Sequence, residues 1–221
     1  MTSEAWLYRH GESVSNAGEP TFTPWDICIT DLGKQQAKNI AAQFSSPPDR
    51  VIVSGYLRTQ QTARPLVSKF NLDCLHPMVN RVNLDPKSSA YLQKLPSRYQ
   101  MWPVQEWTFL CPDRYFGTTQ EERKVPVREY RNKRDPNLVD GFGAESFQQF
   151  LLRVGVFLLR IENEPGLSVV FTHGHFMRAI LWLHQTKLDF RRVGVDEFDS
   201  YWDFFDKTEI PNGHKLVLPL L

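Results

Sequence analysis

Short apolar runs alternate with longer amphipathic segments along this chain of 221 residues, and the alternation limits the folds that it can adopt. The runs at 5–8, 51–53 and 169–171 are each three or four residues long, and helical periodicity follows soon after the last two. Strands that alternate with helices in this way predict βαβ units, in which a mostly parallel sheet carries helices on both faces. The expected fold is therefore an α/β three-layer sandwich.

Helical spacing of apolar residues predicts four helices, and capping signals mark the start of two of them. Thr30 is a suitable N-cap residue, and Ser146 with Gln149 fits a capping box. The predicted helices cover about 30–46, 57–70, 146–161 and 176–185. A final apolar run at 216–218 predicts one more strand, and 196–206 is interpreted as a packed amphipathic segment.

Residues 75–141 depart from this pattern, because the stretch is rich in proline and shows little sustained periodicity. Loops of this length without structure are uncommon in compact domains unless they act as lids or binding loops. We therefore expect one domain over residues 1–221 with an inserted cap at about 75–141. The cap is expected to carry short helices and to pack over one end of the sheet.

Composition excludes several classes of protein. The 26 Lys and Arg residues against 25 Asp and Glu leave a net charge of +1, so no global field favours nucleic acid or membrane surfaces. A hydrophobic content of 41% argues against intrinsic disorder, and three scattered cysteines argue against a disulfide framework or a zinc knot. Because neither a signal peptide nor a stretch of about 20 apolar residues is visible, we expect a cytoplasmic protein without membrane or nucleic-acid partners. The oligomeric state stays open.

Residue types that bind phosphate follow each of the three main apolar runs. Arg9 and His10 end the first, Arg58 comes a few residues after the second, and His173 follows the third. Because ligands of parallel α/β sheets bind at the carboxyl ends of the strands, we expect these side chains to converge there. The guanidinium forks match phosphate oxygens better than a lysine ammonium does.

The order of these motifs resembles the histidine phosphatase superfamily, in its phosphoglycerate mutase-like branch. The resemblance is carried by Arg9-His10-Gly11-Glu12-Ser13, by Ser54-Gly55-Tyr56-Leu57-Arg58-Thr59, by Glu145-Ser146 and by Thr172-His173-Gly174. It implies that His10 is the nucleophile and forms a phosphohistidine that water hydrolyses, while Arg9, Arg58 and His173 hold the phosphate. The expected function is hydrolysis of a small phosphomonoester without metal or cofactor.

The leaving oxygen needs a proton, so a carboxylic acid should reach the site from the cap. Glu106 is the preferred general acid because its segment resembles the place where mutase-like members carry theirs. Asp113 and Glu12 are kept as alternatives.

Three further residues are expected around the phosphate. Gly174 would let a backbone N–H at the start of the following helix come close to the anion. Asn16 either donates its amide to phosphate or stabilises a turn, and both readings stay open. Glu145 is expected to orient an active-site cation or the cap of the next helix. The leaving group is expected to meet residues of the cap, with these candidates: Trp102, Trp107, Tyr115, Arg114 and Arg123.

Three other functions compete with hydrolysis. A mutase is the serious alternative, although Val14-Ser15-Asn16-Ala17-Gly18 lacks the Trp-Asn extension of mutase members. The spacing of His173 and His175 occurs in metal sites, but arginines beside it disfavour a metallohydrolase. A binding-only domain could use the basic residues between 123 and 134, yet acids alternate with them, which favours a solvated helix face.

Overall fold

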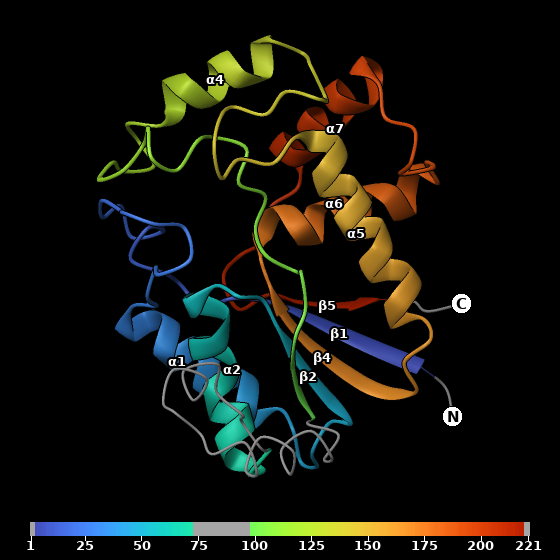
Figure 1. Ribbon diagram of the computed structural model, residues 1–221. Helices are drawn as coiled ribbons and strands as arrows, with labels where there is room; N and C mark the ends of the chain where they lie inside the picture. Colours follow the sequence, from blue (N-terminus) through green and yellow to red (C-terminus); the bar gives the residue numbers. More distant parts are fainter. Residues whose placement is uncertain (1–2, 73–97, 219–221) are drawn as a thin grey trace, which may run out of the picture.

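A five-stranded sheet in the order β3-β2-β4-β1-β5 forms the centre of the molecule (Figure 1). The computed structural model describes residues 3–72 and 98–218. The strands are β1 (Ser3–Arg9), β2 (Arg50–Val53), β3 (Tyr99–Met101), β4 (Gly166–Thr172) and β5 (Lys215–Leu218). The first four run parallel, and only β5 pairs antiparallel, with β1. The predicted α/β fold with a mostly parallel sheet is confirmed.

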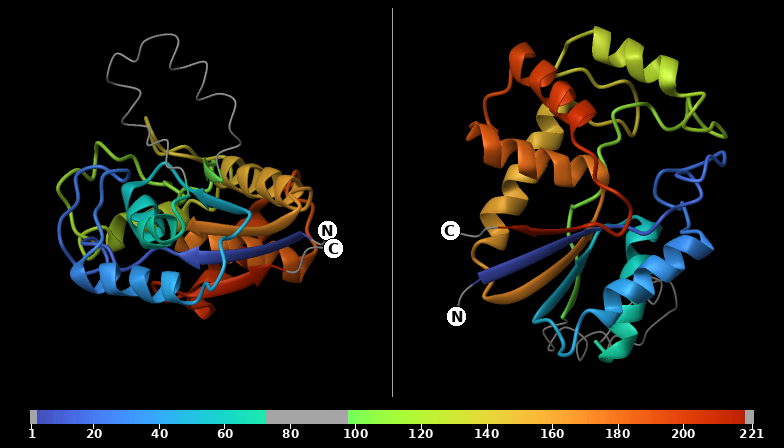
Figure 2. Two further views of the ribbon diagram at one scale, coloured as in Figure 1. Left: turned by 90° about the horizontal axis from the view of Figure 1, so that it is seen from below. Right: turned by 180° about the vertical axis from the view of Figure 1, so that it is seen from behind.

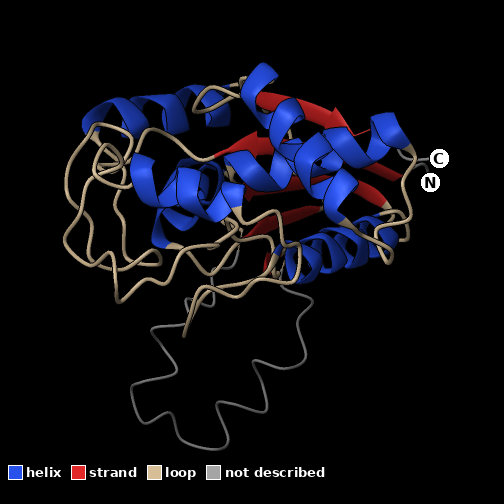
Figure 3. Cartoon of the chain, turned by 90° about the horizontal axis from the view of Figure 1, so that it is seen from above, coloured by secondary structure: helices blue, strands red, loops and turns tan. Residues whose placement is uncertain are grey.

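Helices cover both faces of the sheet, as the three-layer prediction requires (Figures 2 and 3). On one face pack α1 (Asp31–Ala42) and α2 (Leu57–Lys69). On the other lie α5 (Phe147–Ile161), α6 (Gly174–Thr186) and α7 (Val195–Lys207). Successive side chains of a strand point to opposite faces of the sheet, so each strand contributes to two cores. In β4, Val170 belongs to the core under α5, α6 and α7, whereas Val169 and Phe171 belong to the core under α1 and α2.

The predicted capping residues begin their helices. Thr30 accepts a hydrogen bond from the Gly33 N–H at 3.1 Å, and Ser146 and Gln149 form both bonds of the capping box. The first helix ends at Ala42, earlier than the prolines at 47 and 48 led us to expect.

Part of the expected cap, residues 75–97, lies outside the described residues. The remainder contributes β3, an edge strand that the sequence analysis did not predict, and the helix α4 (Lys124–Asn132). β3 is only three residues long, and Pro103 soon follows it, so no period-2 pattern develops. Within the described parts of the chain, no helix combines the length and the apolar character that crossing a membrane would require.

Candidate active site

The predicted phosphate-binding residues meet at the carboxyl end of the sheet. Arg9 of β1 lies beside Thr172 of β4 in the parallel register, so His10 and His173 leave neighbouring strands side by side. Their ring centroids are 5.1 Å apart. A cleft of about 570 Å³ opens here, and its lining includes Arg9, His10, Arg58 and Gly174.

The hydrogen bonds of His10 define which ring nitrogen can act as a nucleophile. Its Nδ1 lies 2.8 Å from the carbonyl oxygen of Gly11, and because a carbonyl only accepts, Nδ1 carries the proton. In a neutral ring Nε2 then holds the lone pair, and it accepts a hydrogen bond from Arg58 Nε at 3.1 Å. Nε2 is therefore the atom that can attack phosphorus.

The imidazole of His10 is kept neutral by its surroundings. Burial is the main cause of a pKa well below the usual 6.5, and the charges of Arg58 and Arg9 lower it further, against a smaller opposing effect of the Gly11 carbonyl. A nucleophilic histidine needs an unprotonated nitrogen, and this environment supplies one at neutral pH.

Close packing of two glycines sets the path of the chain after His10. A Cβ on Gly11 would lie 2.5 Å from the carbonyl oxygen of Gly33, and a Cβ on Gly33 would lie 2.2 Å from that of Glu12. The Thr30 N–H also donates to the Glu12 carbonyl at 2.8 Å. The start of α1 thus supports the segment that carries His10, and any side chain at either glycine would push the two apart.

The buried Arg58 and the partly buried Arg9 bring positive charge to His10. Arg58 Nη1 donates to the Pro24 carbonyl at 2.7 Å, and the guanidinium lies over the Tyr56 ring. Burial lowers the pKa of Arg58 to about 10, so the group remains cationic at neutral pH. Arg9 Nη1 donates to the Ile210 carbonyl, while its buried Nε finds no hydrogen-bond partner among the described residues.

His173 lies behind His10 and is fully buried. Its Nε2 is 2.8 Å from Ser54 Oγ, whereas its buried Nδ1 has no partner in the described parts of the chain. Burial, followed by the charge of Arg58, holds its pKa well below the usual value. Buried polar atoms are almost always hydrogen-bonded, so the unpaired nitrogens of Arg9 and His173 are suited to bind a polar or anionic ligand.

A third arginine, which the sequence analysis missed, lies at the same end of the cleft. A Cβ on Gly174 would come within 2.9 Å of Arg178 Nη1 and 3.5 Å of Arg9 Nε, so both guanidinium groups lie against this glycine. Arg178 Nε donates to the Thr208 carbonyl at 2.6 Å. Its position four residues after Gly174, on the same side of α6, is the signal that could have identified it.

Glu106 reaches the cleft from the cap, unlike the two alternative acids. Its Oε1 accepts a hydrogen bond from the His175 N–H at 2.9 Å, which places the carboxylate at the N-terminus of α6 and in the cleft lining. Glu12 is turned to Thr30 Oγ1, 2.8 Å away, and neither Glu12 nor Asp113 lines the cleft.

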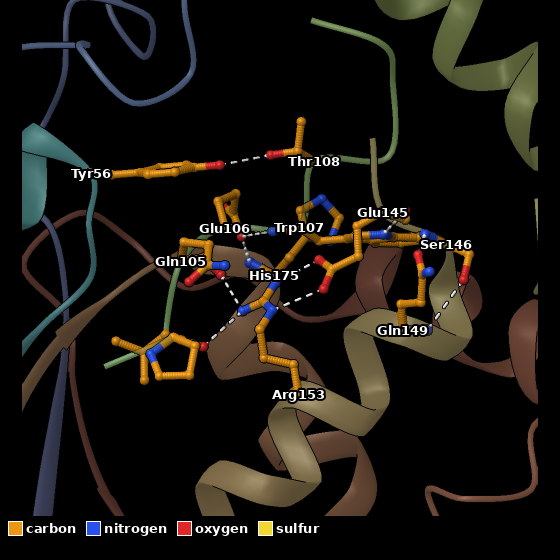
Figure 4. Close-up of polar contacts among 12 residues, drawn as sticks. Tyr56, Gln105, Glu106, Trp107, Thr108, Glu145, Ser146, Gln149, Arg153 and His175 are labelled. Atoms are coloured by element: carbon orange, nitrogen blue, oxygen red, sulfur yellow. Dashed lines mark hydrogen bonds and ion pairs between the residues drawn. The ribbon is translucent and has the colours of Figure 1, made fainter. Parts of the chain in front are cut away.

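Arg153 of α5 supports the backbone that leads into Glu106 (Figure 4). Its Nη1 donates to the carbonyls of Pro103, at 3.1 Å, and Gln105, at 2.9 Å. Its Nε and Nη2 bind the two carboxylate oxygens of Glu145 at 2.9 and 2.6 Å. Glu145 therefore orients Arg153, a residue the sequence analysis did not consider, and does not contact Arg9 or Arg58.

Asn16 lines the cleft and also stabilises its own loop. Its Oδ1 accepts bonds from the Ser13 N–H, Ser13 Oγ and Asn212 Nδ2, at 3.2, 2.9 and 3.2 Å. Its Nδ2 has no partner among the described residues, so an amide donor remains for a ligand.

The residues expected to meet the leaving group divide into two sets. Trp107, Tyr115 and Arg123 line the cleft. Trp102 instead packs inside the core, and Arg114 forms an ion pair with Asp140 at 2.9 Å on the surface. Trp102 and Arg114 are thus placed away from any ligand in the cleft.

His175 contacts an aromatic cluster next to the site. Its Nδ1 is 2.9 Å from Tyr201 Oη, and its ring stacks on Phe205 with centroids 4.5 Å apart. Within residues 3–72 and 98–218, no group of three or more His, Cys, Asp or Glu side chains is arranged to hold a metal ion.

Comparisons with known proteins agree with this geometry. Residues 5–78 and 98–200 match the model of the histidine phosphatase superfamily (branch 1). Over 104 residues the chain is 28% identical to the Probable phosphoglycerate mutase GpmB of Yersinia enterocolitica, a match that covers 46% of this chain and 48% of that relative. The matched part therefore spans about half the length of the relative.

Solved structures of low sequence identity share the fold. A phosphoserine phosphatase of Entamoeba histolytica, 19% identical, superposes with a TM-score of 0.62 and covers 98% of this chain and 90% of its own. The α-ribazole phosphatase of Shigella flexneri, also 19% identical, has a TM-score of 0.62 and covers 97% and 89%. With the family match over most of the chain, the protein belongs to the histidine phosphatase superfamily, branch 1.

Proposed function

We propose that the protein hydrolyses a small phosphomonoester through a phosphohistidine formed on Nε2 of His10. The observation that carries the proposal is the fixed tautomer of this ring: Nδ1–H is bound by the Gly11 carbonyl, and Nε2 keeps its lone pair, which accepts from Arg58 Nε beside a cleft lined by arginines. Phosphoryl transfer depends mainly on positioning and on fixed positive charge, and both are present here.

In the first step Nε2 attacks phosphorus while the bond to the ester oxygen breaks. Arg9, Arg58 and the Gly174 N–H bind the equatorial oxygens, on which negative charge accumulates. The departing alkoxide takes a proton from the Glu106 carboxyl group. The imidazole becomes cationic, and the bond from Nδ1–H to the Gly11 carbonyl stabilises it.

In the second step water attacks the phosphohistidine. Glu106, now a carboxylate, accepts a proton from the water, and the N–P bond breaks to release inorganic phosphate. His10 returns to its neutral form and Glu106 to its acid form, so the cycle needs neither a metal nor a cofactor.

A mutase is the second candidate, favoured by the similarity to a relative described as a phosphoglycerate mutase. The same phosphohistidine would then pass its phosphoryl group to a substrate hydroxyl rather than to water. The absence of a Trp-Asn extension after Val14 supports hydrolysis over this alternative.

The test is release of inorganic phosphate from a panel of phosphomonoesters, with excess chelator, by the wild type and by His10→Ala. We expect turnover in chelator that falls below detection in the variant. His184 is exposed, so His184→Ala is the matched control and should keep full activity. Unchanged turnover in His10→Ala contradicts the proposal, and transfer between phosphoglycerate hydroxyls without phosphate release would favour the mutase.

A further inference from the structure

The cleft is larger than a phosphate group requires. Its volume is about 570 Å³. Since a water molecule occupies about 30 Å³ in the liquid, the cleft has room for roughly twenty groups of that size. A phosphate contributes five non-hydrogen atoms, so most of the space remains for the leaving group.

Three of the cationic side chains that line the cleft belong to its phosphate end. Arg58 binds His10, and Arg9 and Arg178 both lie against Gly174. Two more carry charges that are already paired. Lys124 binds Glu121 at 2.6 Å, and Arg131 binds Asp206 at 2.6 Å.

Arg123 is the remaining arginine in the described lining of the cleft. It lies at the start of α4, which Figure 1 shows well away from the sheet, and it lines the cleft. It forms no salt bridge with any described residue, because the neighbouring Glu122 accepts bonds from Thr119 instead. Burial holds the pKa of Arg123 below its usual value against a smaller opposing effect of the Glu122 charge, so the cation has lost hydration without an ion pair to replace it.

The guanidinium of Arg123 is nevertheless held in place. Its Nη1 donates to the carbonyl and hydroxyl oxygens of Thr118, at 2.6 and 2.9 Å, and to Thr21 Oγ1 at 3.4 Å. Thr21 and Thr118 are themselves bridged by backbone hydrogen bonds, which tie the loop after β1 to the cap. Nε and Nη2 have no partners among the described residues. A fixed guanidinium with free donors is suited to bind a carboxylate or phosphate.

Apolar side chains make up much of the remaining lining. They include aromatic and aliphatic groups from the loop after β1 and from the cap, such as Phe22, Ile27, Phe109, Tyr115 and Val127. A leaving group of sugar-like polarity would leave these surfaces without apolar partners, whereas an aromatic or similarly bulky apolar group would bury them.

We propose that the substrate is a phosphomonoester whose leaving group combines a bulky apolar body with a second anionic group, and that Arg123 binds this second anion. The inference rests on the proposed function for the assignment of the phosphate end. It adds the chemical class of the rest of the substrate.

The test measures binding, so that it does not depend on turnover. Calorimetry compares benzylphosphonate with 4-carboxybenzylphosphonate, and with homologues in which one or two methylene groups separate ring and carboxylate. We expect at least one carboxylated ligand to bind the wild type about tenfold more tightly than benzylphosphonate. Arg123→Gln should bring that ratio close to one, and Lys124→Gln, which alters the adjacent but already paired cation, should keep it.

Equal affinities for all these ligands in the wild type, or a preference that survives Arg123→Gln, would overturn the inference. Hydrolysis of the matched phosphate esters reports separately on the proposed function. If no ester is turned over but the Arg123-dependent preference is present, the hydrolase assignment fails while the second anion site stands.

Discussion

At His10, the same surroundings must keep a nitrogen unprotonated and hold a dianion against it. Burial and the charges of Arg58 and Arg9 lower the pKa of the free imidazole, so the resting enzyme is ready to attack. A bound phosphate neutralises the nearby cations and raises that pKa again. Catalysis is therefore helped by the order of events, since the substrate itself makes the imidazole a better base.

The role of Glu106 can be separated from its structural contact. Glu106→Gln keeps an oxygen that can accept the bond from the His175 N–H but has no proton to give. We expect kcat/KM for an alkyl phosphate to fall by about 10²–10⁴, the usual contribution of a general acid, with loss of the basic limb of the pH–rate profile. For 4-nitrophenyl phosphate, whose leaving group needs little protonation, the fall should be much smaller.

Asp113→Asn is the control for this measurement, because Asp113 is also a carboxylate of the cap but does not line the cleft. An equal loss on both substrates, or an unchanged pH profile in Glu106→Gln, would remove Glu106 from the role of general acid.

Among the helices and strands, local sequence signals predicted the features that they directly determine, such as where a helix starts. The starts of α1 and α5 follow from Thr30 and from Ser146 with Gln149, since a cap acts within one helical turn. β3 was missed because its place depends on pairing with β2, a contact between distant parts of the chain.

The candidate site shows the same difference between local sequence signals and contacts that depend on the tertiary fold. The convergence of His10, Arg58 and His173 could be expected because each directly follows a strand or lies in the first turn of a helix, whereas Arg153 was not considered. Arg153 acts on carbonyls 48 and 50 residues away in sequence, and only the tertiary fold brings these together. The role of such a residue cannot be read from its neighbours along the chain.

Arg153 gives a prediction about how α5 positions the Glu106 segment. Arg153→Met removes the bonds to the Pro103 and Gln105 carbonyls and should lower kcat/KM for the alkyl phosphate about tenfold or more, since misplacement of about 1 Å can cost 10²-fold. The loss should again be smaller for 4-nitrophenyl phosphate. In the Glu106→Gln background the same substitution should add little, because residues that act as a unit are not additive.

Arg160→Met is the matched control on the same helix, because Arg160 is an exposed arginine that lies over the Trp102 ring. If Arg153→Met lowers activity on both substrates to the same extent, its effect is general destabilisation rather than positioning of the acid.

At the scale of the whole molecule, the site depends on both layers of helices. Arg58 begins α2 on one face of the sheet, while Gly174 and Arg178 belong to α6 on the other. His10 lies between them, at the end of β1, the strand that pairs with β4 and β5. Neither layer alone supplies a complete phosphate site, so loss of the global fold and loss of activity should coincide.

Burial of three histidines at this junction makes the fold sensitive to acid. In the folded protein the pKa values of His10 and His173 lie well below 6.5, and that of His175 is about 4. Below pH 6.5 the unfolded chain therefore binds more protons than the folded protein, which lowers the free energy of unfolding. Between pH 7.0 and 5.5 the free energy of unfolding should therefore fall, and His175 alone should account for roughly 1.2 kcal/mol of the loss. Urea unfolding in phosphate-free buffer measures this, in a range above the titration of ordinary carboxyl groups. His175→Gln should reduce the pH dependence, and a constant free energy of unfolding across the range would show that the folded protein does not hold these histidines in the neutral form.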